Sequence, residues 1–170
     1  MPDGFDEAVV LASEELTCVQ VGPVFITHFH GPISAEVLSA LAEARRPRMV
    51  HDGRSTASLT LVEGDVPIPG QREMLEATKV TMELEAGSVC DAVVLLGGGV
   101  FATAARLVLN AIVTRVRTRP HRFFHDIRPA SEWAASYFPD DFDLRYRVEE
   151  ACVRLRNRSR YRTERPVAAD

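Results

Sequence analysis

The stretch DAVVLLGGGVFATAAR, residues 91–106, holds the most suggestive glycine spacing in the chain. Gly97, Gly99 and Ala102 fit the pattern G-x-G-x-x-A, whose glycines let the backbone approach a dinucleotide pyrophosphate at a helix N-terminus. That fingerprint normally opens a domain and precedes several strand–helix units, whereas only one strand and one short helix are expected after it here. We therefore predict a tight strand-to-helix corner and no bound cofactor. A site for an anionic or lipid-like ligand is the alternative, and its residues would be Gly97, Gly98, Gly99 and Val100.

The histidines are candidate metal ligands. His28 and His30 alternate along a predicted strand and so point to one face, while His121 and His125 flank another strand. Four imidazoles could hold a metal ion, but no glutamate or cysteine partner has diagnostic spacing. We expect exposed strand histidines and no metal.

Nucleophilic catalysis finds little support. There is no G-x-S-x-G elbow, and every cysteine lies in an apolar pattern that predicts a buried, inert thiol; the three are Cys18, Cys90 and Cys152. The loop carrying Asp140, Asp141 and Asp143 is interpreted as a solvated helix start, because aspartates favour that position. We do not expect an enzyme.

Composition places the chain in one broad class. Its 170 residues are 46% hydrophobic and 26% charged, as in one globular domain. Three widely separated cysteines suggest neither a disulfide framework nor a zinc knuckle, so we expect a cytoplasmic protein. No apolar stretch approaches the roughly 18 residues that a membrane span needs, and the acidic N-terminus does not resemble a signal peptide.

Charge is divided unevenly between the two parts of the chain. Residues 1–100 hold 15 acidic and 6 basic residues, whereas residues 101–170 hold 9 acidic and 14 basic ones. Five arginines alternate near the C-terminus, namely Arg154, Arg156, Arg158, Arg160 and Arg162. Such a run could bind nucleic acid, but on a helix it scatters around the axis, and the acidic part offers a nearer counter-surface. We therefore favour a solvated or protein-docking tail.

The hydrophobic pattern predicts a mixed, mostly parallel five-stranded sheet in an α/β fold of order ββαβαβαβα. Two antiparallel strands surround a Gly22-Pro23 turn, and the later strands, joined through helices, are expected to be parallel. The expected later strands are 55–65, 90–96 and 121–127, and the expected helices are 35–46, 70–86, 100–119, 129–138 and a last one ending near 158. The predicted divisions are an N-terminal arm (1–15), the α/β domain (16–138) and a C-terminal helix with a basic tail (139–170).

The predicted helix at residues 100–119 is apolar around most of its circumference. A helix that lies on a sheet needs one apolar face, so we expect a second subunit to cover the surplus. The sequence therefore favours a homodimer, with a face formed by Phe101, Leu107, Val108 and Ile112.

This succession of elements resembles the STAS family, the fold of anti-sigma-factor antagonists and of sulfate-transporter C-terminal domains, in its stand-alone bacterial branch. The resemblance covers about residues 16–138. It is carried by the stretches VFITHFHGPISAEVLSAL, SLTLVEGD, PGQREMLEAT and HRFFHDIRPASEWAASYF.

The resemblance implies a regulatory function. In phosphorylatable members a serine or threonine lies at the start of the second helix, where a kinase modifies it. The matching segment here, VEGDVPIPGQ (62–71), has no hydroxyl residue, so the usual switch is missing. We expect a non-catalytic protein-interaction module with an unknown protein partner. Its expected surface is Asp65, Pro67, Pro69, Gly70, Gln71 and Arg72.

Overall fold

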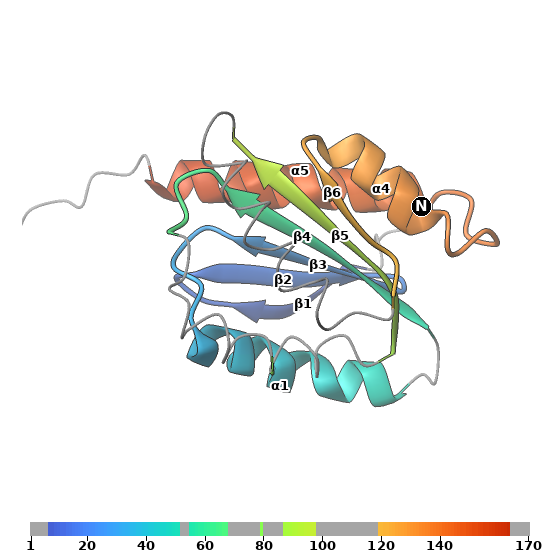
Figure 1. Ribbon diagram of the computed structural model, residues 1–170, viewed down its shortest axis with the longest axis horizontal. Coiled ribbons are helices and arrows are strands. Elements are labelled where there is room, and N and C mark those ends of the chain that lie inside the picture. Colours follow the sequence, from blue (N-terminus) through green and yellow to red (C-terminus); the bar gives the residue numbers. More distant parts are fainter. Residues whose placement is uncertain (1–6, 52–54, 68–78, 80–86, 98–118, 164–170) are drawn as a thin grey trace, which may run out of the picture.

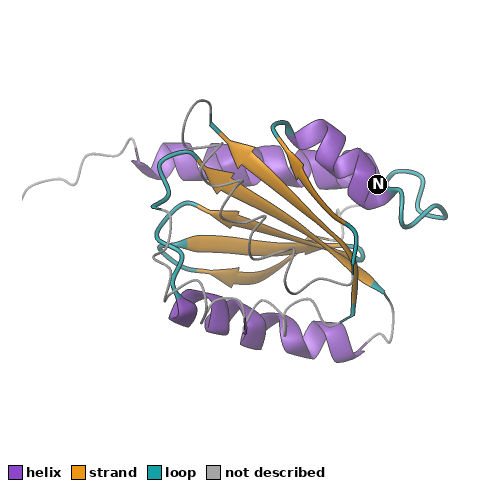
Figure 2. Cartoon of the chain, viewed as in Figure 1, coloured by secondary structure: helices purple, strands orange, loops and turns teal. Residues whose placement is uncertain are grey.

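The computed structural model contains one six-stranded sheet between helices (Figures 1 and 2). It describes residues 7–51, 55–67, 79, 87–97 and 119–163. The strands lie side by side in chain order: β1 Glu7–Ala12, β2 Leu16–Val21, β3 Val24–Phe29, β4 Thr56–Glu63, β5 Ser88–Leu96 and β6 His121–Phe124. The helices of the described residues are α1 Ala35–His51, α4 Ile127–Ala135 and α5 Leu144–Thr163.

The α/β class is confirmed, but the predicted strand count is wrong. The sheet has six strands because residues 7–12, expected to belong to an N-terminal arm, pair antiparallel with β2. This pairing gives the edge of β2 its backbone partner and packs Val10 and Leu11 against a buried cluster. The pairs β1–β2 and β2–β3 are antiparallel, and β3–β4, β4–β5 and β5–β6 are parallel, so the sheet is mixed.

One face of the sheet is covered by α1, which begins where Ser34 Oγ accepts a hydrogen bond from Val37 N at 3.3 Å. Its residues Leu38 and Leu41 are buried against the sheet, at the three-residue spacing of an amphipathic helix. Arg45 is buried too, because its Nη2 donates to Ser58 Oγ at 2.9 Å and its guanidinium lies 4.3 Å from the centre of the Phe25 ring.

Helix α1 continues past the point where the sequence predicted its end. Pro47, expected in a connection, lies inside the helix. Proline removes the N–H that would bond the carbonyl of Glu43. Both residues are exposed, so water can serve that carbonyl and the helix is not forced to end there.

The other face of the sheet is covered by α4 and α5 (Figure 1). Helix α5 packs over β2 and β3, and α4 lies beside α5 and over β5. The α5 stripe that faces the sheet consists of Leu144, Val148, Ala151, Cys152 and Leu155, each at most 3% exposed. Their spacing of three and four residues is the period of an amphipathic helix.

Arginines on both flanks of α5 pair with acidic residues of the sheet. Arg154 forms an ion pair with Glu7 of β1, and Arg156 Nε lies 3.6 Å from Glu63 Oε1 of β4. The interpretation that the acidic part of the chain is the nearer counter-surface is confirmed for these two arginines.

Several predicted features lie outside the described residues. They include most of the expected helix 70–86, the expected helix 100–119 and the expected dimer face Phe101, Leu107, Val108 and Ile112, so the homodimer stays a prediction. None of the helices in the described ranges combines the length and apolar composition that crossing a bilayer requires.

Packing of α5 can be tested by comparing two valines on opposite sides of the helix. Val148 is fully buried and Val153 is 43% exposed. We expect Val148→Ala to lower the free energy of unfolding by about 2 kcal/mol, because it removes buried methyl groups and leaves a cavity. The matched variant Val153→Ala should change it by less than ~0.5 kcal/mol. Urea denaturation measures both, and equal losses would contradict this packing.

Candidate functional site

Charged and polar side chains meet where the parallel strands end, at a surface that we call the carboxyl edge (residues 28–30, 63–67 and 96–97). His28 of β3 lies opposite Leu61 of β4, so Glu63 follows on the same face of the sheet. His28 Nε2 is 3.1 Å from Glu63 Oε1, the oxygen that Arg156 of α5 also approaches. One carboxylate thus links an imidazole of the sheet to a guanidinium of the helix.

The hydrogen bond to Glu63 determines what His28 can do. An ionised carboxylate only accepts hydrogen bonds, so the bond between His28 Nε2 and Glu63 Oε1 uses a proton on Nε2. Among the described residues Nδ1 finds no hydrogen-bond partner. A carboxylate that orients an imidazole is a recurrent device of general bases, but this ring is fully buried. The arrangement therefore serves packing between α5 and the sheet better than proton transfer.

His30 extends the same cluster. Its ring lies edge-on to that of His28, with 5.5 Å between the ring centres, and its Nε2 is 3.4 Å from Thr17 Oγ1. The prediction that both histidines share one face is confirmed. The expectation that His28 is exposed is wrong, because α5 covers this face of the sheet and Glu63 supplies the polar partner that burial requires.

Two glycines bring the ends of β4 and β5 together. A Cβ added to Gly97 would lie 2.9 Å from the Cα of Gly64, closer than real side chains come. Gly97 also has φ of +148°, a backbone conformation that other residues rarely adopt. The first glycine of the predicted corner is therefore required by this close approach, whereas Gly98, Gly99 and Val100 lie outside the described residues.

The start of the predicted interaction surface forms a turn beside these glycines. Val66 N donates to Glu63 O at 3.2 Å, and the Val66 side chain is only 3% exposed. Asp65 and Pro67, on either side of this anchor, are exposed. The remaining predicted members, Pro69, Gly70, Gln71 and Arg72, lie outside the described residues.

The described histidines do not gather as metal ligands. His121 lies at the opposite end of the sheet, where its Nδ1 is 3.0 Å from Asp91 Oδ2, and His125 follows β6. Within the described residues no three side chains of histidine, cysteine or acidic type are placed to hold a metal ion.

The thiols behave as their sequence pattern predicts. All three are free and buried. Burial raises the pKa of Cys18 and of Cys152, and burial together with the neighbouring Asp91 raises the pKa of Cys90 to about 12. Because the thiolate is the nucleophile, none of them is prepared to attack a substrate.

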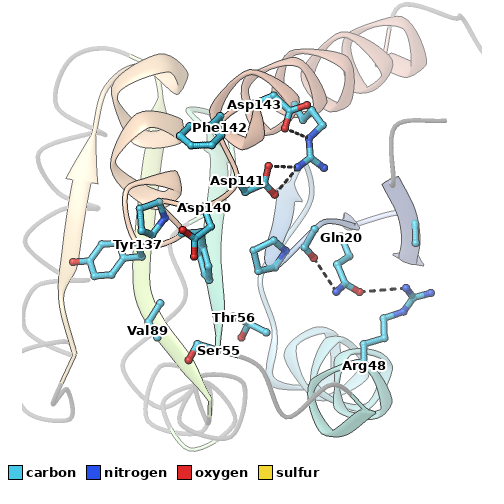
Figure 3. A pocket seen from close by; sticks show the side chains of 16 residues that line it. Gln20, Arg48, Ser55, Thr56, Val89, Tyr137, Asp140, Asp141, Phe142 and Asp143 are labelled. Atoms are coloured by element: carbon cyan, nitrogen blue, oxygen red, sulfur yellow. Dashed lines mark hydrogen bonds and ion pairs between the residues drawn. The ribbon is translucent and has the colours of Figure 1, made fainter. Parts of the chain in front are cut away.

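A cavity of about 1180 Å³ lies at the other end of the sheet, between the amino ends of β4 and β5 and the segment 137–143 (Figure 3). The aspartates of this segment, at 140, 141 and 143, were interpreted from the sequence only as the start of a helix. That interpretation is confirmed in part, since α5 begins directly after Asp143 and Leu144 N donates to Asp141 O at 3.2 Å. The sequence analysis did not identify Arg48 and Gln20 on the opposite wall, because no local sequence pattern marks either residue as part of a site.

Ion pairs order the helix end of this cavity. Arg147 Nη2 donates to both oxygens of Asp141, at 2.7 and 2.6 Å, and Arg147 Nε donates to Asp143 Oδ1 at 3.2 Å. Partial burial opposes ionisation of Asp141, but the hydrogen bond from Arg147 and its charge hold the pKa of that carboxyl below its usual value.

The molecule thus offers two surfaces with different properties, the carboxyl edge and the cavity. The carboxyl edge presents a turn above a buried polar cluster, whereas the cavity is lined by charges of both signs. Searches of protein-family models, of curated proteins and of solved structures found no match to this chain.

The contact between the two glycines predicts a specific sensitivity. Gly97→Ala should lower the free energy of unfolding by about 1–3 kcal/mol, because it combines a left-handed backbone with a clash against backbone atoms. The matched variant Gly64→Ala should cost less, since its Cβ would come no closer than 3.1 Å to its nearest neighbour, Leu96 O. Chemical denaturation measures both values. An unchanged stability of Gly97→Ala would refute the contact.

The buried thiols predict slow chemistry and a pH dependence. At pH 8 a thiol reagent such as DTNB should label none of the three cysteines in the folded protein and all three in denaturant. Because folding raises the pKa of these thiols, the folded state keeps protons that the unfolded state loses above about pH 9. The free energy of unfolding should therefore fall as the pH rises above about 9. Cys90→Ala removes one of these thiols, so the fall should be shallower in that variant. Rapid labelling of the folded protein would contradict the burial.

Proposed function

We propose that this chain is a non-catalytic regulatory module of the STAS-like type, which acts in the cytoplasm by binding a protein partner at its carboxyl edge. The single observation that supports the site is the fixed turn at the end of β4. Val66 is buried, and the contact of Gly64 with Gly97 holds the turn against the end of β5. Asp65 and Pro67 are therefore displayed on a rigid support.

Rigidity favours recognition by a protein. A preformed turn loses little conformational entropy when a partner docks, so more of the interaction energy appears as affinity. An exposed carboxylate beside a proline can select a partner by charge and shape. The segment 62–71 has no hydroxyl group, so phosphorylation within it cannot interrupt the contact. We infer that the surface is displayed permanently.

A charge reversal at Asp65 tests the proposal. Wild type, Asp65→Arg and Glu43→Arg would each be used to capture partners, and the captured protein would then be purified and titrated by calorimetry. Glu43 is exposed on α1, so its reversal changes net charge equally without touching the turn. We expect Asp65→Arg to weaken binding at least about tenfold, ~1.4 kcal/mol, and Glu43→Arg to leave it nearly unchanged. Equal affinities of all three proteins would reject the carboxyl edge as the binding surface.

A further inference from the structure

We propose that the cavity at the amino ends of β4 and β5 binds a zwitterionic ligand of the amino-acid or short-peptide class. In this pose the cationic group of the ligand lies against Asp140 and its carboxylate lies against Arg48. This site is at the opposite end of the sheet from the carboxyl edge and is independent of the partner surface proposed there.

The shape of the cavity sets the size of the ligand. Its volume of about 1180 Å³ slightly exceeds the range of roughly 300–1,000 Å³ common for small-molecule sites. Figure 3 shows Asp140 and Arg48 on opposite sides, with Thr56 on the floor between them. A ligand that contacts both charged walls must therefore extend across the cavity.

The wall formed by residues 137–143 suits an organic cation. The carboxylates of Asp141 and Asp143 are both engaged by Arg147, whereas Asp140 is exposed and has no hydrogen bond or ion pair to any other described residue. Asp140 thus has a carboxylate available for a ligand. Two aromatic residues of the same segment also line the cavity, Tyr137 at 36% exposure and Phe142 at 88%. Aromatic faces attract ammonium and guanidinium groups and bury their aliphatic stems.

The opposite wall suits a carboxylate. Arg48 Nη1 donates one hydrogen bond, to Gln20 Oε1 at 3.3 Å, and Gln20 Nε2 in turn donates to Gly22 O at 3.1 Å. This chain holds the Arg48 guanidinium at the cavity, as Figure 3 shows, and leaves most of its five N–H donors for a ligand. A planar guanidinium matches the two oxygens of a carboxylate.

Charges of both signs decide the class of ligand. A polyamine would place a cation against Arg48, and a dicarboxylate would place an anion against Asp140, so each would meet one repulsive wall. A molecule with an ammonium or guanidinium at one end and a carboxylate at the other meets two attractive walls. Peptides with free termini and a basic residue have that charge pattern.

The probe for the experiment is the tripeptide Arg-Ala-Ala with free termini, titrated into the full chain by calorimetry and by NMR. We expect saturable binding with a Kd of about 1 mM or tighter. Asp140→Asn and Arg48→Gln should each weaken it about tenfold. Asp126→Asn removes an exposed carboxylate at the N-terminus of α4 and should bind like wild type.

A peptide with an amidated C-terminus separates this pose from unspecific attraction. It should bind wild type and Arg48→Gln equally, because the carboxylate that Arg48 recognises is gone. The proposal is overturned if Arg-Ala-Ala shows no saturable binding by about 10 mM, if spermidine binds more tightly than the peptide, or if Asp140→Asn and Arg48→Gln bind as wild type does. Thermal unfolding of each variant shows that it is folded.

Discussion

The packing of α5 across the sheet is the constraint on which the rest of the structure depends. Its buried stripe covers β2 and β3 and completes the core on that face. Burial of each of its larger apolar side chains contributes about 1.5–3 kcal/mol, whereas a partly exposed ion pair contributes ~0.2–1 kcal/mol. Apolar burial therefore stabilises the helix, and the pairs of Arg154 with Glu7 and of Arg156 with Glu63 fix its direction and register.

These pairs also account for part of the uneven charge distribution. The acidic and basic parts of the sequence meet across the interface between α5 and the sheet, so a basic C-terminal stretch need not signify an external polyanion. Arg147 follows the same logic at the start of α5, where it neutralises the aspartates that precede the helix. The arginines at 147, 154 and 156 are therefore structural partners of carboxylates within the chain.

The sequence predicted the elements with strong periodicity and missed those that depend on distant partners. Strand-forming residues on both sides of the Gly22-Pro23 turn located β2 and β3, and the apolar pattern located the first part of α1 at residues 35–46. Strand β1 was missed because, among the described strands, it pairs with β2 alone, and acidic residues near it resemble a solvated arm. The continuation of α1 through Pro47 depends on exposure, which sequence patterns do not reveal.

In the candidate sites, too, features with a local sequence pattern were predicted and features that depend on distant residues were not. The close approach of Gly97 depends on Gly64 at the end of another strand, which the predicted strand-to-helix corner did not include. The buried thiols follow from local residue types and were anticipated. Burial of His28 was not anticipated, since it requires Glu63 from another strand and Arg156 from α5. A usable signal did exist: His28 and Glu63 both stand near the ends of strands that were expected to be parallel. The cavity joins β2, α1 and the segment 137–143, and no local pattern relates segments so far apart.

The position of α5 in the chain has a consequence for how the protein folds. Arg154 and its partner Glu7 are 147 residues apart in sequence, so closing this contact joins the two ends of the described chain. The antiparallel strands β1, β2 and β3 are connected by short turns and can pair early, but they expose one apolar face until α5 arrives. Docking of α5 is therefore a late step. During synthesis on the ribosome, the unfinished sheet would offer that apolar face to chaperones until the helix has emerged.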